Sequence, residues 1–292
     1  MTNLLLIAVA VLGILVLLMP LVVRLAYRVP RVTGQVRPED LMLPGEAVWL
    51  DTENDKRLFG WFIPATTPDG PAPAIAVIHG WGGSSDQLLP LAPLFHEAGY
   101  ALLLLDARNH GRSDSDSFSS MPRFAEDLGH GVDWLQRQPG IDPQRIFVLG
   151  HSVGAAAALL LASRRLDIAG VISIAAFAHP EEVMGRQLAA LHLPRIPVGW
   201  LVLKYIEHAI RHRFDDIAPV NTIEKIQAPV LLVHGEADRL VPPGDMERIY
   251  AKRRDDRVER LCLPGAGHNP ARAIARHGQR LLDFLGRAGG RA

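Results

Sequence analysis

The sequence FVLGHSVGAAAALLLA, residues 147–162, joins an apolar run to an alanine-rich helical segment through one polar pair, His151 and Ser152. Ser152 stands between Gly150 and Gly154 in the pattern Gly-x-Ser-x-Gly. Glycines at these two positions remove side chains that would collide in a tight turn from a strand into a helix. We therefore predict that the hydroxyl of Ser152 projects from a strained turn at the amino end of a buried helix.

A serine hydroxyl becomes a good nucleophile only when an oriented histidine takes its proton. In folds with this turn the chain order is serine, acid, histidine, and the last two lie on loops after late strands. His268 lies in the loop LPGAGHNPAR after the last predicted strand, and Asp238 follows the preceding one. Asp238 is favoured over Glu236 because it stands further past the end of its strand. We predict a triad of Ser152, Asp238 and His268.

The predicted chemistry also needs backbone N–H groups that point at a developing oxyanion. The segment VIHGWGGSS follows the first predicted parallel strand and is rich in glycine, so its backbone can approach a substrate closely. We predict the amides of Val153 and Trp81 as the two donors, with Gly82 as the alternative to Trp81. His79, in the same segment, is interpreted as structural.

Six short apolar runs follow one another along the chain, separated by longer segments with helical spacing. They are residues 74–80, 101–107, 145–151, 170–177, 229–235 and 258–265. Apolar strands that alternate with helices indicate a parallel sheet covered on both faces. Residues 47–65 add two strands that are predicted to pair as an antiparallel hairpin.

One connection, residues 178–228, is too long for a single crossover helix and predicts a helical insertion. Within it, residues 199–212 combine a narrow polar stripe with a wide apolar remainder. Three uses of the apolar part stay open: packing on the domain, roofing an acyl pocket, and contact with a bilayer.

The amino terminus carries twenty uncharged residues, Leu4–Val23. As a helix they would span about 30 Å, the thickness of a hydrocarbon core. A signal peptide is the alternative, but the residues before the run carry no basic side chain and those after it offer a poor cleavage site. The arginines that follow favour a single-pass membrane protein with its domain on the cytoplasmic side; they are Arg24, Arg28, Arg31 and Arg37.

The predicted organisation has three parts. Residues 1–30 form a transmembrane anchor, residues 31–45 form a Pro/Gly-rich linker, and residues 46–292 form one α/β domain. The helical insertion, at about residues 178–228, is expected to act as a small lid on that domain.

Composition restricts the partners and cofactors. The chain has 31 basic and 31 acidic residues, so it has no net charge that would favour nucleic acid. The lone cysteine, Cys262, excludes an intrachain disulfide and a multi-cysteine metal site. The metal and nucleotide motifs His-Glu-x-x-His, Gly-Lys-Ser/Thr and Gly-x-Gly-x-x-Gly do not occur in a fitting context. We expect no cofactor, no metal and no nucleic-acid partner, and the oligomeric state stays open.

Five segments, in this order, resemble the α/β-hydrolase superfamily: HGWGGS, DARNHGRSD, GHSVG, HGEADRLVP and GAGH. The likeness covers residues from about 45 to 288 and is greatest to the serine aminopeptidase-like and lysophospholipase-like branch. It implies the α/β-hydrolase fold, a mostly parallel central sheet with helices on both faces and a small helical lid. It also implies the same triad. Asn109 replaces the first glycine of the family's usual Asp-x-Arg-Gly-x-Gly-x-Ser, a departure that concerns pocket shape.

The sequence therefore predicts a membrane-anchored serine hydrolase that cleaves carboxylic esters, lipid-like or small, through an acyl-enzyme intermediate. A peptidase or aminopeptidase, or an acyltransferase or thioesterase, could use the same triad. A peptidase would need an acid to hold the substrate's amino group, for which Glu181 and Glu182 are the candidates. The remaining alternative is a non-catalytic binding protein on a hydrolase frame, against which the intact triad counts.

Overall fold

The computed structural model describes residues 13, 17–66, 70–269 and 271–290. The chain divides into two compact units, one formed by Val29–His179 with Asp215–Ala292 and the other by Met1–Arg28 with Pro180–Phe214. The predicted membrane span, Leu4–Val23, lies for the most part outside the described residues. Of the part that is described, residues 17–26 are helical. No helix among the described residues combines the length and the apolar character needed to cross a bilayer.

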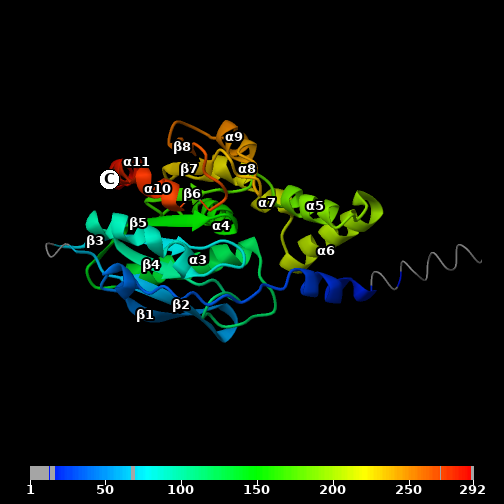
Figure 1. Ribbon diagram of the computed structural model, residues 1–292, viewed down its shortest axis with the longest axis horizontal. Helices are drawn as coiled ribbons and strands as arrows, with labels where there is room; N and C mark the ends of the chain where they lie inside the picture. The colour runs from blue at the N-terminus through cyan, green and yellow to red at the C-terminus, as the bar shows by residue number, and fades with distance from the viewer. Residues whose placement is uncertain (1–12, 14–16, 67–69, 270, 291–292) are drawn as a thin grey trace, which may run out of the picture. The chain divides into compact units, whose positions relative to one another are not determined.

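The larger unit is built on a sheet whose described strands run in the order β1-β2-β4-β3-β5-β6-β7-β8 (Figure 1). β1 pairs with β2 and β2 with β4 in antiparallel fashion, and every other pairing is parallel. The strands are β1 (Glu46–Thr52), β2 (Lys56–Ile63), β3 (Ala72–Ile78), β4 (Ala101–Leu105), β5 (Ile141–His151), β6 (Gly170–Ile174), β7 (Val230–Gly235) and β8 (Val258–Leu263). The mostly parallel sheet with an antiparallel hairpin at its edge confirms the prediction from the apolar runs.

Helices cover both faces of this sheet. The helices of the larger unit are α2 (Ala92–Glu97), α3 (Met121–Gln136), α4 (Val153–Ala162), α8 (Pro219–Thr222), α9 (Gly244–Ala251), α10 (Ala271–Arg276) and α11 (Gly278–Gly289), with α7 (Phe214–Ile217) at its boundary. Phe147 of β5 belongs to the same core cluster as Phe284 of α11. Val148, the next residue of the strand, points to the opposite face, which α3 and α4 cover. Both side chains are buried, as the continuous apolar run requires.

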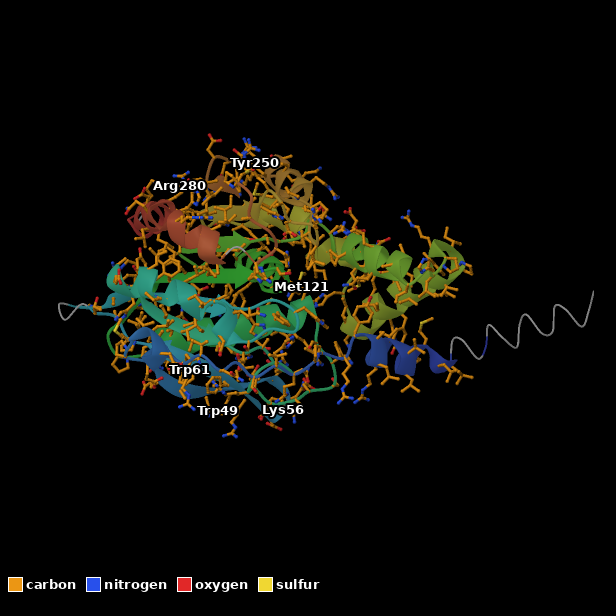
Figure 2. The ribbon with its side chains drawn as sticks, viewed as in Figure 1. Trp49, Lys56, Trp61, Met121, Tyr250 and Arg280 are labelled. Carbon is orange, nitrogen blue, oxygen red and sulfur yellow. The ribbon has the colours of Figure 1, made fainter. Side chains whose placement is uncertain are left out.

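The antiparallel hairpin at the sheet edge is joined by aromatic contacts. Figure 2 shows Trp49 on β1 and Trp61 on β2. The ring of Phe59 meets both indoles edge-on, with centroid distances of 5.5 Å to Trp49 and 5.3 Å to Trp61. Such pairs contribute about 0.5–1.5 kcal/mol beyond the burial of their area, so they stabilise a hairpin that has no neighbour beyond β1.

The smaller unit contains the central part of the predicted insertion. It holds α5 (Pro180–Ala190), the short turn η5 (Arg195–Gly199) and α6 (Trp200–Ile210). α6 confirms the helix expected over residues 199–212, and its polar stripe carries an ion pair of 2.6 Å between Lys204 and Glu207. The rest of the predicted insertion, residues 215–228, belongs to the larger unit.

The residues on either side of the segment Pro180–Phe214 are joined within the larger unit. Nε2 of His179, the last residue before α5, lies 3.1 Å from Oδ1 of Asp215, the first residue after the smaller unit. Residues 36 positions apart in sequence are thereby held together at one place.

Candidate active site

The turn between β5 and α4 has the strained geometry that the Gly-x-Ser-x-Gly pattern predicts. Ser152 has φ 55° and ψ −116°, a conformation that side chains disfavour and that surrounding structure must impose. A Cβ on Gly150 would collide with the backbone of Gly154, and one on Gly154 would collide with the carbonyl oxygen of His79. The amide of Ser152 donates a 2.8 Å hydrogen bond to the carbonyl of Ile174 in β6, which fixes the turn to the sheet.

The structure brings the three residues of the predicted triad together. Nε2 of His268 lies 3.0 Å from Oγ of Ser152. Nδ1 of the same ring lies 2.8 Å from Oδ2 of Asp238. His268 thus bridges a hydroxyl and a carboxylate that come from loops after β5 and β7, and both contacts have hydrogen-bond length.

Asp238 is held by its own loop. Its side chain is fully buried, and Oδ1 accepts hydrogen bonds of 2.9 Å from the amides of Leu240 and Val241. Oδ2 is left to face His268, so the loop fixes the direction of the carboxylate. Glu236, the alternative weighed from the sequence, is exposed.

His151 is a residue of the site that the sequence reasoning did not single out. Its Nε2 lies 2.8 Å from the main-chain carbonyl oxygen of His268, and the two rings are 5.0 Å apart. Burial lowers the pKa of His151 to about 4, so the ring is neutral near pH 7 and Nε2 carries the proton that it donates to this carbonyl. The only sequence signal was its position, a polar side chain directly before the nucleophile.

The backbone segments that carry the two predicted oxyanion donors pass close to Ser152. Val153 is the first residue of α4, where backbone N–H groups have no acceptor in a preceding turn. A Cβ on Gly80 would lie 3.2 Å from the Cβ of Ser152, so the backbone that leads into Trp81 passes close to the nucleophile. Gly82 follows with φ 71°, a left-handed turn directly after Trp81.

Buried rings pack against the loop that contains Trp81. The indole of Trp81 stacks on Phe124 at 6.4 Å, and the rings of His79 and His110 lie 5.0 Å apart beside them. Nε2 of His79 accepts a 3.1 Å hydrogen bond from the amide of Ala107, and its Nδ1 donates to the carbonyl of Gly80. Burial lowers the pKa of His79 to about 4 and that of His110 to about 3, so both rings are neutral near pH 7. These contacts agree with the structural interpretation of His79.

Asn109, where the family's usual motif has glycine, adopts φ 69°. This left-handed conformation suits glycine, and asparagine is among the few other residues that tolerate it. Its side chain adds two contacts, since Nδ2 donates to Oγ of Ser119 at 3.1 Å and Oδ1 accepts from the amide of Asp116 at 2.7 Å. The replacement therefore keeps the turn and ties it to the following loop.

A cavity of about 220 Å³ lies entirely within the larger unit. His151 and Asn269, the direct neighbours of Ser152 and His268 in the chain, form part of its wall. The full lining is Gln87, Leu88, His151, Ile174, Asn269, Ala271 and Ile274. Four of these side chains are aliphatic and two carry amides, so the cavity suits a small, mainly apolar group.

Within the ranges that the structure describes, no group of three or more His, Cys, Asp or Glu side chains is placed to hold a metal ion.

The chain is similar in sequence to known proteins. The family model described as serine aminopeptidase, S33, matches residues 69–215. An uncharacterized protein of Mycobacterium tuberculosis, Rv2307c, is 31% identical over 255 residues, which are 87% of this chain and 83% of the relative. The α/β-hydrolase domain-containing protein WAV2 of Arabidopsis thaliana is 27% identical over 219 residues, 74% of this chain and 69% of the relative.

Solved structures show the same fold. The esterase Pf2001 of Pyrococcus furiosus superposes with a TM-score of 0.73 at 25% identity, over 90% of this chain and 98% of that one. Est1E of Butyrivibrio proteoclasticus, at 19% identity and a TM-score of 0.66 over 82% of this chain and 100% of that one, shares the fold. With the family model matched over half of the chain and this sheet order, the protein belongs to the serine aminopeptidase S33 family of α/β-hydrolases.

Proposed function

We propose that this hydrolase cleaves carboxylic esters through a covalent acyl-enzyme, with Ser152 as nucleophile, His268 as general base and acid, and Asp238 as the residue that orients the histidine. The supporting observation is the continuous contact through one imidazole, 3.0 Å to the hydroxyl and 2.8 Å to the carboxylate. A serine becomes a nucleophile at neutral pH when a base stands within this distance.

In the first half of the reaction, Nε2 of His268 takes the proton of Ser152 as Oγ attacks the carbonyl carbon of the ester. The amides of Val153 and Trp81 would stabilise the negative charge on the carbonyl oxygen; removal of one such donor typically reduces the rate about 10²–10³-fold. The tetrahedral intermediate then collapses. His268 gives the proton to the leaving alcohol, and the acyl group stays on Ser152.

In the second half, His268 takes a proton from water as the water attacks the acyl carbon; the bond to Oγ then breaks, His268 returns the proton to Oγ of Ser152, and the acid is released. The carboxylate of Asp238 stabilises the imidazolium that forms in each half and keeps Nδ1 protonated. Its two amide contacts support this part, because they leave Oδ2 in place whether or not the ring is charged.

The cavity lined by His151 and Asn269 favours a small substrate group. Its volume of about 220 Å³ lies below the range of about 300–1,000 Å³ for pockets of drug-sized ligands. A short acyl or alkyl chain fills such a space, with the side-chain amides of Gln87 and Asn269 available to a polar atom. We propose small or medium-chain esters as the substrates of this site.

An aminopeptidase activity is the second candidate, because the family model carries that description. It would need an acid for the substrate's ammonium group, and Glu181 and Glu182 in the first turn of α5 are the candidates. Aminoacyl p-nitroanilides assayed beside p-nitrophenyl esters distinguish the two: a larger kcat/KM for the anilides would replace the ester proposal.

The direct test of the chemistry is a fluorophosphonate probe, which labels an activated serine. We expect labelling of the wild-type protein, none of Ser152→Ala, and a loss in kcat for p-nitrophenyl butyrate of about 10⁶-fold in that variant. Labelling that persists in Ser152→Ala would show that another group is the nucleophile. Turnover confined to acetate esters would contradict the proposed use of the cavity.

We also propose that residues 4–23 anchor the protein in a membrane, with the hydrolase unit on the cytoplasmic side. Twenty uncharged residues followed by arginines support this arrangement. Fractionation checks the anchor, which predicts that the protein stays in the membrane pellet after alkaline carbonate. Release into the supernatant would contradict it. Protease added to spheroplasts checks the orientation, since cleavage of the hydrolase unit would place it outside.

A further inference from the structure

Exposed apolar side chains are concentrated in the smaller unit. Among the described residues, sixteen large hydrophobic side chains are exposed, and nine of them belong to this unit, which is under a fifth of what is described. The nine are Leu17, Leu18, Leu21, Val22, Leu25, Leu191, Leu193, Ile196 and Trp200. Clustering of this kind marks a surface that another apolar phase covers.

The last four of these residues lie in the connection between α5 and α6 and on the first residue of α6. The two helices form a hairpin: a Cβ on Gly199, at the start of α6, would lie 3.8 Å from the side chain of Leu188 in α5. The amide of Leu193 donates to the carbonyl of Leu188 at 3.1 Å, and that of Gly199 to the carbonyl of Pro194 at 3.0 Å. These bonds fix the backbone of residues 191–200, which we call the hairpin tip.

The hairpin tip presents its apolar side chains outward. Ile196 is 77% exposed, Leu191 65% and Trp200 53%, and every residue from 191 to 197 is exposed. A well-ordered tip with leucine, isoleucine and tryptophan pointing into water has the composition of elements that lie in the interface of a bilayer.

The charges around the hairpin tip indicate which kind of apolar partner this surface would contact. Within the hairpin tip Arg195 is the only residue that is charged at pH 7, and no acidic residue occurs there. Outside the tip, Lys204 is paired with Glu207 at 2.6 Å, and Glu181 and Glu182 precede Arg186, so the positive charge is confined to the tip itself. Anionic lipid head groups attract such a segment, and a membrane with acyl chains beneath them matches both its charge and its apolar tip.

We propose that the hairpin tip inserts into the head-group region of an anionic bilayer, as a membrane contact additional to residues 4–23. The tip belongs to the same compact unit as residues 17–28, so a chain anchored by residues 4–23 holds the tip within reach of the same membrane. This inference does not rest on the hydrolytic chemistry, and it concerns a different segment from the proposed anchor.

The test uses the full chain in vesicles and one fluorescent label at a time. Cys262, the lone cysteine, is exposed and is first replaced by serine. Ile196→Cys then carries a nitrobenzoxadiazole label on the hairpin tip, and Leu166→Cys carries it on the larger unit. The pair is matched, since both native side chains are 77% exposed.

The vesicles contain phosphatidylcholine with phosphatidylglycerol, with and without a nitroxide on the acyl chains. We expect the label at position 196 to shift to the blue and to be quenched by the nitroxide, and the label at 166 to do neither. The shift should weaken in vesicles of phosphatidylcholine alone. Fluorophosphonate labelling of Ser152, measured on the same samples, reports the chemistry separately.

Several results would overturn the proposal. Equal emission from the two labels, quenched or unquenched, would mean that the hairpin tip has no membrane contact of its own. A blue shift at position 196 that appears without lipid and grows with protein concentration would assign the tip to a second copy of the chain. Failure of the protein to associate with vesicles would overturn both the tip contact and the anchor, but not the hydrolase proposal.

Discussion

His151 links the turn at Ser152 to the loop of His268 through one hydrogen bond, from its Nε2 to the carbonyl oxygen of His268. This bond goes to the main chain of His268 and not to the hydroxyl of Ser152. His151 can therefore influence the site by holding His268 in position. A neutral hydrogen bond of this kind contributes about 0.5–1.5 kcal/mol. The alignment of His268 with Ser152 therefore depends in part on a neighbour that performs no proton transfer.

Replacing His151 by phenylalanine keeps a ring and removes the donor. We expect kcat for p-nitrophenyl acetate to fall about threefold to tenfold, in line with the loss of one hydrogen bond, with a smaller change in KM. His151→Gln, which still offers an N–H group, is expected to recover part of the loss. Steady-state kinetics of the wild type and both variants checks this. A kcat of His151→Phe equal to that of the wild type would refute the positioning role.

Asn109 offers a test of backbone conformation at one residue. Its φ of 69° lies where a Cβ is disfavoured. Asn109→Ala and Asn109→Gly both lose the side-chain contacts, but glycine adopts this conformation freely. Urea denaturation should find the alanine variant less stable than the glycine variant by about 1 kcal/mol. The reverse order would mean that unfolded-state entropy outweighs the strain.

At the scale of elements, a buried ion pair ties the loop after β4 to α3. Nε of Arg108 lies 2.6 Å from Oδ1 of Asp127, and the two side chains are 2% and 1% exposed. The amide of Arg108 also donates to Oδ2 of Asp127 at 2.8 Å. Each oxygen of the carboxylate thus accepts a hydrogen bond from Arg108, and Asp127 holds the loop after β4 in place.

Removing that carboxylate leaves the buried guanidinium of Arg108 with Glu126 at 2.7 Å and Asp116 at 3.6 Å as acidic partners. Because the charge stays partly compensated, we expect Asp127→Ala to lower the free energy of unfolding by about 1.5–3 kcal/mol, the contribution of hydrogen bonds to a charged group. Asp255→Ala, which breaks a partly exposed pair with Arg257, should change it by no more than about 1 kcal/mol. Denaturant unfolding of the two variants provides the comparison. Losses of equal size would show that burial of the pair is not what sets its contribution.

The differences between the predicted and observed elements are found at the strand ends. The apolar run 74–80 was read as one strand, but β3 ends at Ile78 because His79 and Gly80 turn into the loop beside Ser152. The run 170–177 likewise ends at Ile174, and Ala175 takes φ 56°. Apolar composition predicts burial but does not distinguish a strand from a buried loop. The last residues of these apolar runs therefore belong to the loops that form the site and not to the strands.

The candidate site was predictable where local pattern sets geometry. The strained turn at Ser152 follows from its two glycines, and chain order placed Asp238 and His268 after the right strands. His151 could not be found in this way, because its partner is a backbone carbonyl 117 positions away. A hydrogen bond to a distant main-chain atom leaves no spacing in the sequence.

For the whole molecule, three buried histidines lower stability in acid, while Asp127, whose pKa burial raises to about 6, acts in the opposite direction. His79, His110 and His151 have pKa values lowered by burial to about 4, 3 and 4, against about 6.5 in the unfolded chain. Between pH 6.5 and 4 the unfolded state therefore binds more protons, and the free energy of unfolding falls as pH falls. Each histidine is expected to contribute a loss of about 2–3 kcal/mol by pH 4.5.

His110→Phe removes one of the three titrating rings. Whatever its stability at pH 7, the fall in its free energy of unfolding between pH 7 and 4.5 should be smaller than in the wild type by about 2–3 kcal/mol. Denaturant titrations at the two pH values measure this difference. An unchanged fall would mean that His110 does not bind its proton on unfolding in this range.

The 3.1 Å contact between His179 and Asp215 has a consequence for the segment of chain between them. It joins the points where the chain leaves the larger unit and returns to it, and all three members of the triad lie outside the stretch it encloses. A change in the length of the segment between these two residues should cost little, since closing a loop twice as long costs only about 0.6 kcal/mol. We therefore expect insertions or deletions within residues 180–214 to leave the positions of Ser152, Asp238 and His268 unchanged.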